Sequence, residues 1–99
     1  MKILILSILA LIFTPQTAKA DPVDCEGMAR IASIVMEKRQ NGAAMSDIIK
    51  IVKGNSLAER MAVEAYEVRR FKAPIWQATE VADFRDKWYL DCYKATALE

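Results

Sequence analysis

Two cysteines, Cys25 and Cys92, restrict the possible folds of this chain more than any other feature. Two cysteines allow one intramolecular pairing, and here the bridge closes a loop of 67 residues. A disulfide that closes a loop of that size lowers the entropy of the unfolded chain, which stabilises the folded domain by roughly 4 kcal/mol. Cys25 opens the first predicted helix and Cys92 lies in the last turn of the fourth. We therefore expect a bridge between them to hold these two helices side by side and antiparallel.

The alternatives for the two thiols are a redox site, a metal site, or a free or intermolecular role. The chain has no C-x-x-C motif and no histidine, and two thiols are too few for the four ligands of a structural zinc site. We therefore expect a structural disulfide between Cys25 and Cys92, with no metal and no cofactor.

Residues 1–20 have the pattern of a cleaved secretory signal peptide. Lys2 supplies a positive start, residues 3–13 are almost entirely apolar, and Ala18-Lys19-Ala20 is a small-x-small cleavage site. The apolar run is shorter than the roughly 18 residues that span a bilayer, so we expect no stable membrane anchor after cleavage. An uncleaved amphipathic anchor is the alternative. Export places the rest of the chain in an oxidising compartment, the periplasm or the exterior, where disulfides persist.

The predicted mature chain, residues 21–99, is expected to form one small domain. Removing Lys2 and Lys19 takes the formal net charge from +1 to about −1, which leaves no basic excess to hold nucleic acid. The absence of histidine removes the commonest general base and the usual pH switch near neutrality. We expect a protein that is not an enzyme and does not bind nucleic acid.

Four segments have helical periodicity, and no segment has a strand partner. The second segment is short and rich in β-branched residues, so a strand is its alternative interpretation. The sequence predicts an all-α domain of four helices, the second short, closed by one disulfide. The helices are expected near residues 25–40, 46–53, 56–70 and 75–95.

Polar residues mark the expected helix ends. Asp24 is a good N-cap for the first helix. Ser56 and Glu59 have the spacing of a capping box at the start of the third helix. Arg69 and Arg70 are expected to end this helix before Pro74. The apolar faces of the four segments predict the core: Met28, Ala32, Val35 and Met36; Ile48, Ile49, Ile51 and Val52; Leu57, Met61, Ala65 and Val68; Val81, Phe84, Trp88 and Cys92.

The stretch from Tyr66 to Trp76 alternates aromatic and cationic side chains around a proline. Arginine, tyrosine and tryptophan dominate the hot spots of protein interfaces. The sequence therefore predicts a partner-binding corner. The structural alternative is that Phe71 and Trp76 staple the turn to the core while its basic residues complement a helix dipole. The candidate residues are Arg69, Arg70, Phe71, Lys72 and Trp76.

Two resemblances rest on short motifs. The chain resembles small exported bacterial or phage-encoded proteins of no assigned function, through Cys25 at a helix start, the run Arg39-Gln40-Asn41-Gly42, and the segment from Phe84 to Cys92. It is also similar, through Asp24-Cys25-Glu26, to the periplasmic acid-stress chaperones. That second resemblance implies a small exported helical protein with one disulfide and a chaperone function.

The expected function is binding of another envelope protein through a rigid helical surface, in the manner of small periplasmic inhibitors and immunity proteins. The expected oligomeric state is a monomer or a weak dimer. The alternative function is that of a periplasmic acid-stress chaperone, in which protonated carboxylates loosen the bundle and expose aromatic residues such as Phe84 and Trp88.

Overall fold

The structure is a computed structural model that describes residues 24–97, so the predicted signal peptide lies outside the described residues. The described part is all-α, with no strand, and the strand alternative for the second segment is wrong. The four predicted helices are confirmed as α2 (Cys25–Gln40), α3 (Met45–Val52), α4 (Ser56–Glu67) and α5 (Pro74–Ala97).

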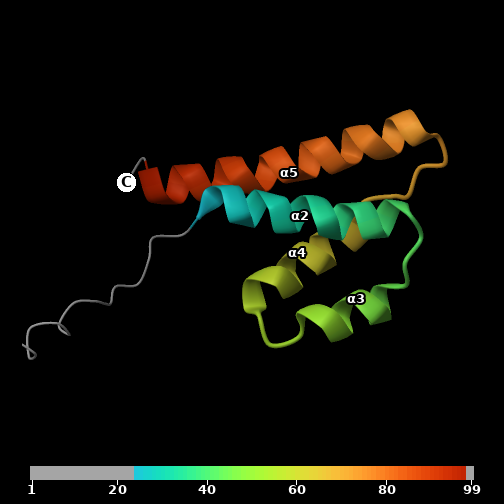
Figure 1. Ribbon diagram of the computed structural model, residues 1–99, viewed down its shortest axis with the longest axis horizontal. Helices are drawn as coiled ribbons and strands as arrows, with labels where there is room; N and C mark the ends of the chain where they lie inside the picture. The colour runs from blue at the N-terminus through green and yellow to red at the C-terminus, as the bar shows by residue number, and fades with distance from the viewer. Residues whose placement is uncertain (1–23, 98–99) are drawn as a thin grey trace, which may run out of the picture.

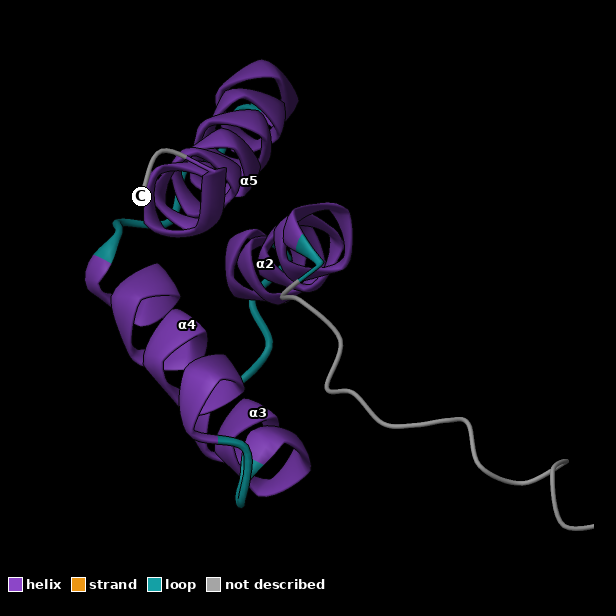
Figure 2. Ribbon diagram, turned by 90° about the vertical axis from the view of Figure 1, so that its left-hand side faces the viewer, coloured by secondary structure: helices purple, strands orange, loops and turns teal. Residues whose placement is uncertain are grey.

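Helix α2 is central and contacts the other three helices. Its longest contact is with α5, which runs antiparallel beside it (Figure 1). Helices α3 and α4 pack on another side of α2 and extend away from the α2–α5 pair, as the end-on view in Figure 2 shows. The molecule is therefore a long helical pair with a shorter pair laid against it.

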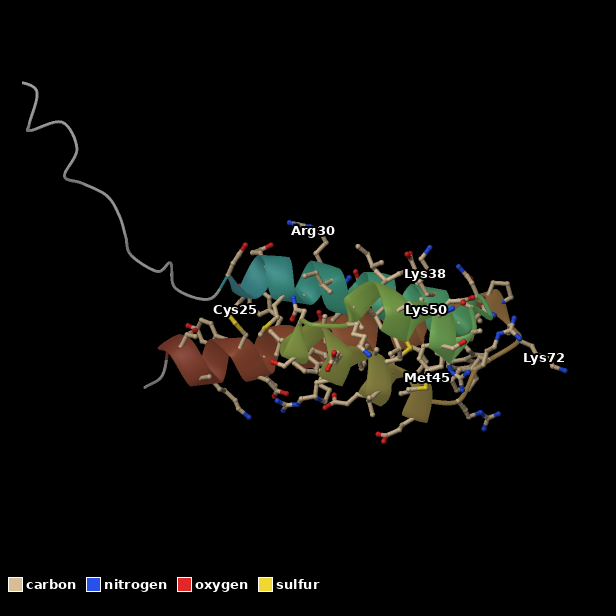
Figure 3. The ribbon with its side chains drawn as sticks, turned by 90° about the horizontal axis from the view of Figure 1, so that it is seen from below. Cys25, Arg30, Lys38, Met45, Lys50 and Lys72 are labelled. Atoms are coloured by element: carbon tan, nitrogen blue, oxygen red, sulfur yellow. A yellow bond between two sulfur atoms is a disulfide. The ribbon has the colours of Figure 1, made fainter. Side chains whose placement is uncertain are left out.

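The disulfide between Cys25 and Cys92 is confirmed, with 5.5 Å between the two Cα atoms. It joins the first turn of α2 to the C-terminal part of α5, as the sequence predicts. Figure 3 shows Cys25 in the space between these two helices. One end of the antiparallel pair is thus fixed covalently.

The core lies where three helices meet α2, and small residues of α4 allow close approach. Phe84 and Trp88 of α5 are buried and meet edge to face, with ring centroids 6.3 Å apart. Ile48 and Val52, one turn apart on α3, are buried as predicted, but Ile51 is 76 % exposed. That expectation was wrong because successive residues turn by about 100° around a helix, so α3 cannot bury all its apolar residues against one side. The buried cluster comprises Ala32, Val35, Met36, Ile48, Val52, Ala58, Met61, Ala62, Ala65, Phe84 and Trp88.

The start of α4 differs from the predicted capping box by one residue. Asn55, not Ser56, is the N-cap, and its Oδ1 accepts a hydrogen bond from the Ala58 backbone N–H at 3.0 Å. The Glu59 carboxylate accepts from the Gly54 N–H at 2.9 Å. Gly54 has φ +96°, a conformation that glycine adopts without strain, and this turn places Asn55 in the capping position.

The end of α4 also differs from the expectation. The helix ends at Glu67, and Val68 is already extended, so Arg69 and Arg70 lie in the connection to α5 and do not close α4. Pro74 is the first residue of α5, a position where its missing N–H costs no helical hydrogen bond. The connection between Glu67 and Pro74 contains most of the predicted corner.

Candidate functional site

The predicted corner lies at the end of the molecule where α2 ends and α5 begins, opposite the disulfide (Figures 1 and 3). Its members come from the α4–α5 connection and from the first turn of α5. Figure 3 shows Lys72 projecting into solvent from this end. The structure therefore brings Arg69, Arg70, Phe71, Lys72 and Trp76 into one region.

A buried glutamine at the end of α2 fixes the connection. Gln40 is 1 % exposed, the one polar side chain among the buried residues of the described chain. Its Nε2 donates to the Arg69 carbonyl at 3.0 Å, and its Oε1 accepts from the Phe71 N–H at 2.8 Å. The Gln40 side-chain amide therefore provides hydrogen-bond partners for two backbone groups of a connection that has no regular secondary structure. The backbone of the connection is therefore tied to the end of α2 at Arg69 and Phe71.

Arg70 is exposed, but its guanidinium lies against the end of α2. Its Nε donates to the Gln40 carbonyl at 2.9 Å. The guanidinium also lies against Gly42, where an added Cβ would stand 3.0 Å from its Nη2. Gly42 has φ +92°, so this glycine serves both the turn and the close approach of the arginine. Arg70 thus helps to hold the corner together, and its role in binding stays a prediction.

A second arginine, Arg39, also contacts the α4–α5 connection. Its Nε donates to the Val68 carbonyl at 3.0 Å, and its guanidinium lies 5.0 Å from the centre of the Tyr66 ring. The Tyr66 hydroxyl donates to the Ala43 carbonyl at 2.7 Å. Burial raises the pKa of Tyr66 above its usual value, although the nearby Arg39 cation opposes the shift. Tyr66 is therefore a neutral hydrogen-bond donor at physiological pH.

The outer part of the corner is exposed and combines apolar and cationic side chains. Trp76 is 56 % exposed and its neighbour Ile75 is 68 % exposed. Phe71 is half-buried, and the Arg69 guanidinium lies 4.8 Å from its ring centre. The stapling alternative therefore fits Phe71 but not Trp76, whose ring does not pack into the core.

The corner presents exposed side chains that another molecule can contact. The ionisable side chains of residues 66–76 are three cations, Tyr66 and Glu67. Across residues 24–97, no three His, Cys, Asp or Glu side chains are grouped closely enough to hold a metal ion. None of the helices described here is long and apolar enough to cross a bilayer.

Gln40 was missed as a site residue, although a signal was present. It continues the four-residue spacing of Met28, Ala32 and Met36 on the core face of α2. A polar side chain on a core face has to find partners inside the protein. Its partners were not predictable, because they are backbone groups of a segment about thirty residues later in the chain. Comparison of the chain with known protein families, curated proteins and solved structures found no match in any of the three.

Proposed function

We propose that this protein is exported and binds another protein of the cell envelope through the exposed part of the corner. We call this part the corner surface; it consists of Arg69, Phe71, Lys72, Ile75 and Trp76. The observation that carries the proposal is the exposure of Trp76, at 56 %, in the first turn of α5, directly after a connection that Gln40 holds at Arg69 and Phe71. Tryptophan is among the most favourable anchors of protein interfaces, and leaving it in water forgoes its burial energy.

Rigidity supports the same proposal. Binding costs free energy for every loop that has to be ordered, and a surface ordered in advance avoids that cost. The corner surface follows a connection tied to α2 by Gln40 and Arg70, and it continues into the first turn of α5. The protein would present Trp76 and Ile75 with little further ordering.

The charges of the corner surface indicate the partner's chemistry. Arg69 and Lys72 precede the two exposed apolar residues in the chain, and both cations are exposed. A complementary partner would have an apolar pocket for Trp76 bordered by carboxylates. The bound protein would be encountered after export, where the Cys25–Cys92 disulfide is stable.

A capture experiment in extracts of the host envelope tests the proposal. Replacing Trp76→Ala should weaken capture by roughly 30-fold, the effect of losing a hot spot of about 2 kcal/mol. The thermal midpoint should stay unchanged, because the indole is exposed. Leu90→Ala, an exposed apolar residue of α5 outside the corner, is the matched control and should capture normally. Equal capture by both variants, or no capture by the unaltered protein, would contradict the proposal.

The structure offers less support for the acid-stress chaperone. The Lys87 ammonium lies 3.1 Å from Glu64 and 3.2 Å from Asp91, which links α5 to α4. Burial lowers the pKa of Lys87, but the two carboxylates outweigh it and the net shift is upward. All three side chains are substantially exposed, so protonating the carboxylates would cost at most about 1 kcal/mol per pair. Loss of these pairs in acid is a weak driving force for opening the bundle.

A further inference from the structure

A second apolar surface lies along α2, away from the corner surface. One hollow lies between α2 and α3 and is lined by Ile31, Ile34, Lys38 and Ile51, among others. Another lies between the starts of α2 and α4 and is lined by Asp24, Met28, Ile31 and Leu57, among others. Ile31 lines both hollows, so they lie next to each other along α2 and together make an apolar depression beside this helix. We call this feature the α2 trough.

Isoleucines at the edge of the trough are unusually exposed. Ile31 is 44 %, Ile34 46 % and Ile51 76 % exposed. Ile31 and Ile34 also form a ridge on α2 itself, since they lie nearly one turn apart on the helix. The same molecule therefore presents an apolar ridge and an apolar trough side by side. That combination fits a second copy of the chain, because the ridge of each copy can enter the trough of the other.

Charges at the two ends of the trough are self-complementary. Asp24 lines it at one end and Lys38 at the other. Asp24, Ile31 and Lys38 are spaced seven residues apart. Seven residues are close to two helical turns, so Ile31 and Lys38 share one face of α2. Asp24 is the extended residue just before this helix, and it lines the trough at the helix start. A two-fold axis through Ile31 would bring Lys38 of each copy beside Asp24 of the other.

From this geometry we infer that the protein forms a reversible homodimer in which the α2 helices of two copies pack antiparallel across a two-fold axis at Ile31. A membrane surface fits less well, because it is flat and anionic, whereas the trough is concave and has one charge of each sign at its ends. The near-zero net charge also does not oppose self-association. The inference is independent of the corner surface, which shares none of these residues.

Sedimentation equilibrium of the protein purified after export is the first test. A monomer–dimer equilibrium is expected at concentrations up to about 1 mM, the range of weak association. Ile31→Ser should weaken dimerisation by more than tenfold. Leu90→Ser, an exposed apolar residue of α5, should leave it unchanged. A protein that stays monomeric throughout, or a dimer that Leu90→Ser disrupts and Ile31→Ser does not, would overturn the inference.

A charge exchange tests the two-fold pairing itself. Lys38→Glu alone and Asp24→Lys alone should each weaken the dimer at low salt, because like charges would then face each other across the interface. The double variant should restore it, because both pairs re-form with reversed sign. Circular dichroism at each concentration confirms that α2 remains folded, since Asp24 also precedes this helix. Failure of the double variant to regain dimerisation, with helicity intact, would refute this arrangement.

Discussion

At the scale of single residues, the most consequential side chain is an uncharged one. Gln40 carries no charge, unlike the neighbouring arginines, yet it fixes two backbone groups of the α4–α5 connection. Arg70 then covers the same helix end by bonding the Gln40 carbonyl. The exposed Trp76 depends on these buried contacts, because they set the path of the backbone that leads to it.

Gln40→Met is expected to destabilise the protein by about 3 kcal/mol, because it keeps the side-chain volume but leaves the Phe71 N–H and the Arg69 carbonyl without partners. Urea unfolding monitored by circular dichroism measures the change. Gln77→Met is the matched control. Gln77 bonds the Phe71 carbonyl from a half-buried position, so its loss should cost about 1 kcal/mol. Equal effects of the two substitutions would argue against the role given to Gln40.

At the scale of helices, local signals located the elements well and their ends less well. Helix α2 begins and ends at the predicted residues, because its apolar face and the following Asn41-Gly42 stop are unambiguous. Helix α4 ends earlier than predicted, because Gln40 offers the Arg69 carbonyl and Phe71 N–H partners outside any helix. These hydrogen bonds come from a residue far away in the sequence, so the residues around the end of α4 could not predict them.

Asn55→Ala is expected to destabilise the protein by about 1 kcal/mol, because its side chain caps the Ala58 N–H. Ser56→Ala should change stability by less than about 0.5 kcal/mol, because Ser56 is the first residue of α4 and is exposed. Thermal unfolding of the two single variants distinguishes the two capping arrangements. A larger effect for Ser56→Ala would favour the capping box predicted from the sequence.

The candidate site was only partly predictable. The composition of residues 66–76 located the corner, since aromatic and cationic residues alternate there. It could not separate Arg70, which faces Gln40, from Arg69, which lies over Phe71. Likewise, the apolar positions of α3 were recognisable, but the exposure of Ile51 depends on which side of this short helix faces α2 and α4. In both cases, the side-chain direction depends on tertiary packing, which the sequence alone does not give.

At the scale of the whole molecule, the α2–α5 pair is secured at both ends. The Cys25–Cys92 bridge fixes one end, and Gln40 with Arg70 fixes the other. Helices α3 and α4 lie within the loop that the bridge closes. The bridge stabilises the protein mainly by reducing the conformational entropy of the unfolded chain. The Gln40 hydrogen bonds instead stabilise the folded state directly.

Reduction of the disulfide is expected to lower the free energy of unfolding by about 4 kcal/mol, because the unfolded chain regains the entropy of an open loop. Urea titrations with and without dithiothreitol measure this difference. A Cys25→Ser/Cys92→Ser double variant should match the reduced protein and should not respond to the reagent. A loss of less than about 1 kcal/mol would show that the reduced chain is already restricted by residual structure.

The bridge also makes the chain from Cys25 to Cys92 a closed covalent ring. A protease that cuts once inside this ring, at the exposed Gly54–Asn55 turn for example, opens the ring but releases no fragment. Both pieces stay tethered beside each other, so the α2–α5 pair retains its high local concentration after the cut. In an extracellular setting rich in proteases, damage at one peptide bond would not by itself separate the two long helices.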